Sequence, residues 1–166
     1  MTDLPDFAQN AQSNGILVDT NLLVLFVVGA VNRRRIPQFK RTSRYTPADY
    51  DLLTRVVGRF SLNYTLPHLL TEVSNLTDLP GSERAAARAL FRDIVSVLKE
   101  VPLASRDACD TQCYPHVGLA DAAIALAVQH HQCSVLTDDS DLCRVLAARG
   151  ASVLNFDYLR QSLWNS

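Results

Sequence analysis

The fold of this chain is organised around the stretch Gly-Ile-Leu-Val-Asp-Thr-Asn, which occupies residues 15–21. Three consecutive apolar residues precede Asp19, and a second apolar run, residues 22–28, follows it. A short unbroken apolar run bounded by turn residues is typical of a strand buried on both faces. If this strand ends at Val18, Asp19 lies at its carboxyl end, where open parallel sheets place their ligands. Thr20 or Asn21 can then cap the next helix, although Asp19 could equally be only a cap itself.

The rest of the chain alternates between predicted strands and helices. Further strands are expected at residues 63–66, 101–104, 133–136 and 151–154. Helices are expected at residues 20–30, 47–60, 68–76, 82–99, 118–129, about 137–150 and 156–164, with a Cys-containing loop before residue 118. Such alternation predicts an α/β protein, a parallel sheet with helices on both faces. Residues 15–166 should form one domain, preceded by a flexible N-terminus at residues 1–14.

Composition narrows the class of protein. Hydrophobic residues make up 48% and charged residues 20% of the 166 residues, which is typical of a globular chain. The net charge of -1 gives no overall attraction to nucleic acid, so a polyanionic partner would need a local basic patch. The chain does not open like a signal peptide, and its longest charge-free apolar run, residues 22–31, is too short to span a bilayer. We therefore expect a cytoplasmic protein without membrane contact.

One segment, residues 31–46, is strongly basic and contains no acid; we call it the basic segment. Its cations, which would be candidate RNA-binding residues, are Arg33, Arg34, Arg35, Lys40, Arg41 and Arg44. A solvated insertion without a role is an equally good interpretation. The cysteines do not indicate a zinc site. Cys109, Cys113 and His116 have a spacing that could bind zinc, but no second Cys or His pair completes the site.

Acidic residues recur at matching places along the predicted sheet. Asp19 ends the first strand, while Asp139 and Asp141 follow the fourth. Asp121 is the only charge in the apolar helix 118–129, and Glu72 sits among the apolar positions of helix 68–76. In a doubly wound sheet these acids should approach one edge, where they repel one another unless they share protons or bind a cation. Oxygen ligands of this kind suit Mg²⁺ or Mn²⁺, which can activate water for phosphodiester hydrolysis.

Four segments in this order resemble the PIN-domain nucleases. They are Leu-Val-Asp-Thr-Asn, Leu-Thr-Glu-Val, Gly-Leu-Ala-Asp-Ala-Ala-Ile and Leu-Thr-Asp-Asp-Ser-Asp-Leu, and together they cover most of residues 15–154. The resemblance implies a three-layer α/β/α fold with a five-stranded parallel sheet of order 3-2-1-4-5. It also implies a ribonuclease that depends on Mg²⁺ or Mn²⁺. The residues that match the family's catalytic acidic quartet are Asp19, Glu72, Asp121 and Asp139.

The resemblance extends to the roles of individual residues. It makes Asp19, Asp121 and Asp139 metal ligands, with Asp141 as a second acid of the last motif, although Asp138 could face the metal instead. Asn21 and Thr137 would support the site by hydrogen bonding, although structural capping explains both residues almost as well. Glu72 would join the metal through a water or orient the attacking water.

The resemblance leaves the partners and the biological role open. Family members of this size are often toxins held silent by a small antitoxin, and both such a partner and a homodimer stay open. The basic segment is longer than in compact members. A PIN module that only binds RNA or a protein partner is the alternative to a nuclease. A receiver-like phosphotransfer domain fits poorly, because the third predicted strand ends in Val-Pro-Leu-Ala without an acid.

Overall fold

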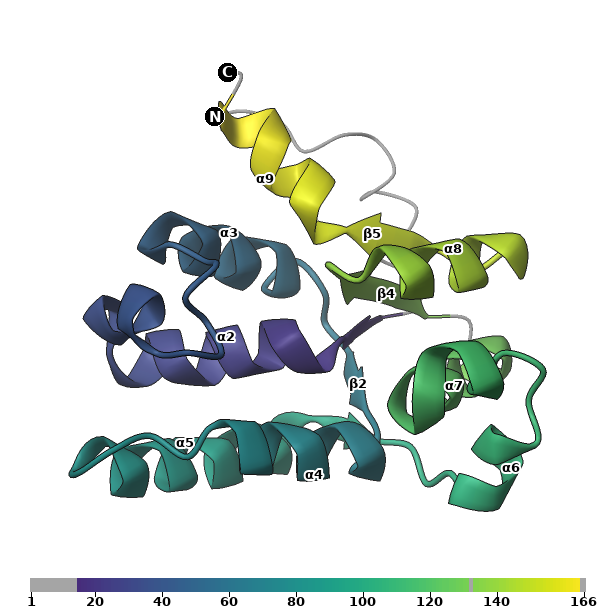
Figure 1. Ribbon diagram of the computed structural model, residues 1–166, viewed down its shortest axis with the longest axis horizontal. Helices are drawn as coiled ribbons and strands as arrows, with labels where there is room; N and C mark the ends of the chain where they lie inside the picture. The colour runs from purple at the N-terminus through teal and green to yellow at the C-terminus, as the bar shows by residue number, and fades with distance from the viewer. Residues whose placement is uncertain (1–14, 132, 165–166) are drawn as a thin grey trace.

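Five parallel strands form a single sheet of order β3-β2-β1-β4-β5 (Figure 1). The strands are β1 (Ile16–Val18), β2 (Asn63–Thr65), β3 (Lys99–Glu100), β4 (Ser134–Thr137) and β5 (Val153–Asn155). This is a computed structural model, and it describes residues 15–131 and 133–164. The strand order and the parallel pairing confirm the expected topology. The expectation of a flexible N-terminus concerns residues 1–14, which lie outside the described residues.

Helices cover both faces of the sheet. They are α2 (Thr20–Val31), the 3-10 helix η1 (Arg33–Gln38), α3 (Pro47–Val57), α4 (Pro67–Leu76), α5 (Glu83–Val97), α6 (Ser105–Cys109), α7 (Tyr114–His131), α8 (Ser140–Ala148) and α9 (Phe156–Trp164). Figure 1 shows α2 and α3 on one side of the central strands and α6 and α7 on the other. The central strand β1 contributes side chains to the hydrophobic core on both faces of the sheet, because Ile16 and Val18 belong to one apolar cluster and Leu17 to the other. The three-layer α/β/α architecture is therefore confirmed.

Local sequence signals explain where several elements begin. Helix α3 starts with Pro47 after a capping box in which Thr46 and Asp49 bond each other's backbone N–H. Helix α2, by contrast, is capped by Asp19, whose Oδ1 accepts the N–H of Thr20 at 2.6 Å. The expectation that Thr20 or Asn21 caps this helix was wrong. The backbone turns into the helix immediately after β1, so the residue that ends the strand is also the cap.

Several boundaries differ from those predicted by one to three residues, among them those of α3, α5, α8, β4 and β5. Two further differences are larger. The third strand is Lys99–Glu100, not residues 101–104. It is an exposed strand at the sheet edge, so its side chains are polar, whereas the apolar Val101 that suggested a strand is buried in the core beyond it. The expected Cys-containing loop includes the short helix α6, and α7 begins before Gly118. Gly118 breaks α7 with φ of +83°, a conformation that glycine adopts without the strain other residues incur.

The basic segment is folded onto the core. It begins in α2, continues through η1, and buries the side chains of Ile36, Thr42 and Tyr45. The Thr42 hydroxyl donates to the carbonyl of Ile36 at 2.8 Å and so closes the turn that follows η1. The interpretation of this segment as a solvated insertion is therefore incorrect at these three residues, while most of its charged side chains are exposed.

Candidate functional site

Four acids from separate segments lie within electrostatic reach of one another at the carboxyl edge of the sheet. Asp19 directly follows β1 and Asp139 lies between β4 and α8, while Glu72 and Asp121 come from α4 and α7. The negative charges of Asp19, Asp139 and Glu72 all raise the pKa of Asp121. The tertiary structure thus brings together the four acids that the sequence motifs singled out. We call them the acidic cluster.

Asp19 is almost completely buried, with 5% of its surface exposed. Its Oδ1 accepts the backbone N–H of Thr20, and its Oδ2 accepts the hydroxyl of Thr137, each at 2.6 Å. Burial raises the pKa of Asp19 to about 6; the two hydrogen bonds oppose this rise, and the charges of Asp138 and Asp139 add to it. Ionising this carboxyl group in the folded protein is therefore costly without a nearby cation.

Asp121 is only half-buried but is the most perturbed acid of the cluster. Burial contributes most to raising its pKa, followed by the charges of Asp19, Asp139 and Glu72, and the pKa reaches about 7. Within the described residues its carboxylate takes part in no hydrogen bond or ion pair. Near neutral pH this group therefore exists in both protonated and ionised forms.

The other two members of the cluster are held by hydrogen bonds. Glu72 is exposed, and its Oε2 accepts the hydroxyl of Thr20 at 2.8 Å, which links α4 to the start of α2. Asp139 caps α8, because its Oδ1 accepts the N–H groups of Asp141 at 2.7 Å and Leu142 at 3.0 Å. Sequence analysis did not assign Thr20 to the site. A hydroxyl directly after the strand-ending acid was the available signal, but its partner lies 52 residues away.

Of the two expected supporting residues, only Thr137 contacts the cluster. Its hydroxyl donates to Asp19 Oδ2 and accepts the backbone N–H of Asp139 at 3.0 Å. Thr137 therefore ties the acid after β1 to the acid after β4. Asn21 is exposed, and its side chain forms no hydrogen bond with any residue in the described ranges.

The two remaining acids of the last motif point elsewhere. Asp141 is exposed and forms an ion pair with Arg144 on the same helix at 2.9 Å. Its charge is not among those that shift the pKa of Asp19 or Asp121. Asp138 is buried and binds Arg44 and Tyr45 of the basic segment. Asp139 is thus the acid of this motif that faces Asp121.

The arrangement of these donors decides how well a metal ion would fit. Among residues 15–131 and 133–164, no three His, Cys, Asp or Glu side chains are grouped so that they could hold a metal ion. The chemistry of the acidic cluster nevertheless suits a hard divalent cation. Its donors are carboxylate oxygens and Asp121 is unbonded. Burial and then the charges of the other three acids raise the pKa of Asp121, and a bound cation would oppose both effects. The donor atoms are thus of the type that Mg²⁺ or Mn²⁺ prefers, but the described side chains are not grouped closely enough to hold an ion.

Half of the candidate RNA-binding cations already form ion pairs with acidic residues of this protein. Arg33 pairs with Asp51, Arg35 pairs with Glu83 at 2.7 Å, and Arg44 pairs with Asp138 and Asp157. The remaining cations are exposed and form no ion pair with the described residues; we call them the unpaired cations. They are Arg34, Lys40 and Arg41. Only these three are free to contact a phosphate without breaking an existing pair.

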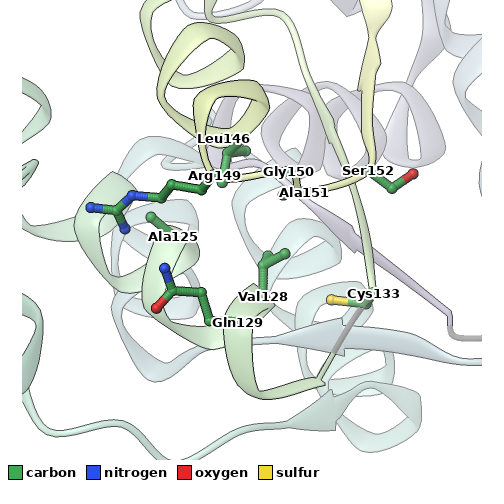
Figure 2. Close-up of a pocket in the computed structure, with 9 residues that line it drawn as sticks. All are labelled: Ala125, Val128, Gln129, Cys133, Leu146, Arg149, Gly150, Ala151 and Ser152. Atoms are coloured by element: carbon green, nitrogen blue, oxygen red, sulfur yellow. The ribbon is translucent and has the colours of Figure 1, made fainter.

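Two hollows in the surface flank the sheet at opposite ends. A groove of about 600 Å³ adjoins the acidic cluster, with Glu72 in its wall beside His68, Asn75 and Leu119. A pocket of about 460 Å³ lies at the other end of the strands (Figure 2). Cys133 and Ser152, which line this pocket, come just before β4 and β5, so it is remote from the carboxyl edge. The groove has an acid of the cluster in its wall, and a further pocket of about 500 Å³ lies at the same edge beside Ser140 and Asn155.

No protein-family model matches the chain, and a search of curated proteins finds no match to it either. The function therefore has to be inferred from the site.

Proposed function

We propose that the protein is a divalent-metal-dependent endoribonuclease, similar to the PIN-domain nucleases, which hydrolyses phosphodiester bonds of RNA. The observation that carries this proposal is the convergence on Asp121 of three other acidic charges from distant segments. Clustered carboxylates destabilise a fold that binds no cation. A role in binding a cation and a phosphate accounts for this arrangement better than helix capping, which requires only one acid at each helix.

Each member of the cluster has a proposed role. Asp19, Asp121 and Asp139 would hold Mg²⁺ or Mn²⁺, which when bound lowers the pKa of a water and neutralises phosphate charge. Thr137 keeps Asp19 oriented through its hydrogen bond to Oδ2. Glu72 is anchored through one carboxylate oxygen by Thr20, and its other oxygen is available to orient the attacking water. Asp141, which pairs with Arg144, is left without a role at the metal.

Substrate and location follow from the surroundings of the cluster. The residues that line the groove include neither Lys nor Arg, so it suits a base or a ribose better than a phosphate. The unpaired cations would supply phosphate contacts. In the described residues no helix combines the length and the apolar character needed to cross a bilayer. We propose a cytoplasmic enzyme, and a toxin held silent by a small antitoxin is the role to test first through neighbouring genes.

The second candidate function is a PIN-like module that binds RNA or a protein without cleaving it. Two observations favour it: the described side chains form no closed group of metal ligands, and both Asp19 and Asp139 cap helices. Incubation of purified protein with RNA, in Mn²⁺ or Mg²⁺ and in EDTA, separates the two functions. We expect cleavage that requires metal and is lost in Asp19→Asn. Asp93→Asn is the matched control, since it removes an exposed acid of α5 that pairs only with the neighbouring Arg92.

The nuclease proposal fails if wild type cuts no RNA with either metal and behaves like Asp19→Asn. RNA binding without cleavage would instead support the non-catalytic module.

A further inference from the structure

The basic segment grips a buried acid beside the acidic cluster. The hydroxyl of Tyr45 donates to Oδ2 of Asp138, and the guanidinium of Arg44 lies 3.0 Å from the same oxygen. The side chain of Asp138 is only 1% exposed. A buried carboxylate is costly unless it is hydrogen-bonded, so these two contacts decide whether Asp138 can stay in place.

The two residues that hold Asp138 are themselves fixed from outside the segment. Arg160 of α9 binds both carboxylate oxygens of the buried Asp49, at 2.8 and 3.1 Å, and donates to the carbonyl of Arg44 at 3.3 Å. The ring of Tyr45 lies 5.2 Å from the guanidinium of Arg44 and 5.6 Å from that of Arg160. Burial and the charge of Asp138 raise the pKa of Tyr45, so its hydroxyl stays protonated and able to donate.

Asp138 lies between Thr137 and Asp139, at the carboxyl end of β4. Thr137 before it bonds Asp19, and Asp139 after it donates its N–H to Thr137 and caps α8. The contacts that fix the side chain of Asp138 therefore also fix the backbone at residues 137–139, which carries the hydrogen bonds of Thr137 and Asp139. The second oxygen of Asp138, Oδ1, is buried without a hydrogen-bond partner in the described part of the chain. Loss of Tyr45 or Arg44 would remove one of the two contacts that offset the cost of burying the Asp138 carboxylate.

We propose that the basic segment is a brace for the candidate site, in which Tyr45 and Arg44 act on Asp19 and Asp139 through Asp138. Tyr45, Arg44 and Asp138 are then positioning residues, not metal ligands and not RNA contacts. The catalytic consequence rests on the proposed ribonuclease function, whereas the effect on the turn at residues 137–139 does not. The brace gives the basic segment a purpose that its charge alone did not indicate.

The first test needs neither metal nor substrate. Amide hydrogen exchange is measured by NMR on metal-free wild type, Tyr45→Phe and Tyr50→Phe. The control removes a hydroxyl from nearby α3 that bonds no described residue. In Tyr45→Phe, we expect the Asp139 amide to lose protection by about tenfold, the equivalent of one hydrogen bond to a charged group. Unchanged protection at Asp139, or an equal loss in Tyr50→Phe, would overturn the brace.

The second test is kinetic. Outer partners of metal ligands typically affect activity or metal affinity by about 10–100-fold, so we expect Tyr45→Phe to lower kcat within that range while KM for RNA changes little. If Tyr45 acts only through Asp138, the double variant with Asp138→Asn should be no slower than Asp138→Asn alone. Independent, multiplying effects would contradict the brace, as would a rise in KM with kcat unchanged.

The two tests separate this inference from the proposed function. Faster exchange at Asp139 in a wild-type background that cuts no RNA would support the brace and refute the nuclease. Metal-dependent cleavage by wild type, together with unchanged exchange in Tyr45→Phe, would support the nuclease and refute the brace.

Discussion

The charge of Asp121 offers a test of the acidic cluster that requires no knowledge of the substrate. Replacing Asp121 with Asn keeps the shape of the side chain and removes its negative charge. Because burial and three neighbouring charges raise the pKa of this carboxyl group, the ionised form is unfavourable in the metal-free fold. We therefore expect Asp121→Asn to melt at a higher temperature than wild type in EDTA.

The size of the effect follows from the pKa. The rise from 3.8 to about 7 would correspond to about 4 kcal/mol for a fully buried group. Asp121 is only half-buried, and solvent screening reduces the expected gain to about 1–2 kcal/mol. In a protein of this size that gain raises the melting temperature by about 2–8 °C.

The pH dependence has a defined sign. The folded-state pKa of Asp121 lies above its unfolded value of 3.8, so the favourable contribution of the protonated group is fully present below pH 3.8. Wild type loses that contribution as the pH rises towards about 7. The advantage of Asp121→Asn should therefore grow over this window and become constant above it. In acid the two proteins should melt alike.

Added metal should reverse the order of the two melting temperatures, so that wild type melts higher than Asp121→Asn. An ion that binds only the folded cluster stabilises it by about 2.7 kcal/mol at a hundredfold excess over its Kd. Wild type should gain this stability in Mn²⁺, and Asp121→Asn should gain little, as followed by thermal melts monitored by circular dichroism. If the Asn variant melts at or below wild type in EDTA near pH 8, and neither protein responds to Mn²⁺, Asp121 is a structural residue and the metal site should be abandoned.

Three further predictions concern the surroundings of the cluster. Thr137→Val should lower the unfolding free energy by about 1–3 kcal/mol in urea titrations, because it leaves the buried Oδ2 of Asp19 without a hydrogen-bond donor, while Thr137→Ser should cost less. Gly29→Ala should cost about 1–3 kcal/mol, because a methyl group there would collide with the ring of Tyr50; an unchanged melting temperature would contradict this packing. Replacing the unpaired cations with Ala should weaken RNA binding and lower the log–log salt slope by about one for each phosphate that the protein no longer binds. A matched variant at the paired cations should keep that slope; it comprises Arg33→Ala and Arg35→Ala.

Several features of this fold were predictable because they depend on local sequence. The apolar run at residues 16–18 indicated a strand buried on both faces, and each of its residues is at most 5% exposed. The alternation of strands and helices predicted a parallel sheet, since parallel strands need a crossover and a helix is the usual one. The boundaries of α9 were also predicted, because an apolar strand before Phe156 and a helical pattern after it mark the transition.

Other features arise only when distant segments pack together. Lys99–Glu100 pairs as a strand because β2 offers it a free edge, and its polar side chains show no strand pattern. Thr20 meets Glu72 only because α4 returns alongside α2. Both contacts depend on how whole elements are placed, which local propensity does not encode.

The acids at residues 138–141 show most clearly the difference between what local sequence and what tertiary packing determine. The sequence placed three acids directly after β4 but could not say which of them faces the cluster. Asp138 turns to the basic segment because Tyr45 and Arg44, which precede it by more than ninety residues, provide the hydrogen bonds that a buried carboxylate requires. Asp139, the next residue, is left to face Asp121. Local sequence thus determined where charge follows a strand, and tertiary packing determined which charge is neutralised within the protein and which remains available to a ligand.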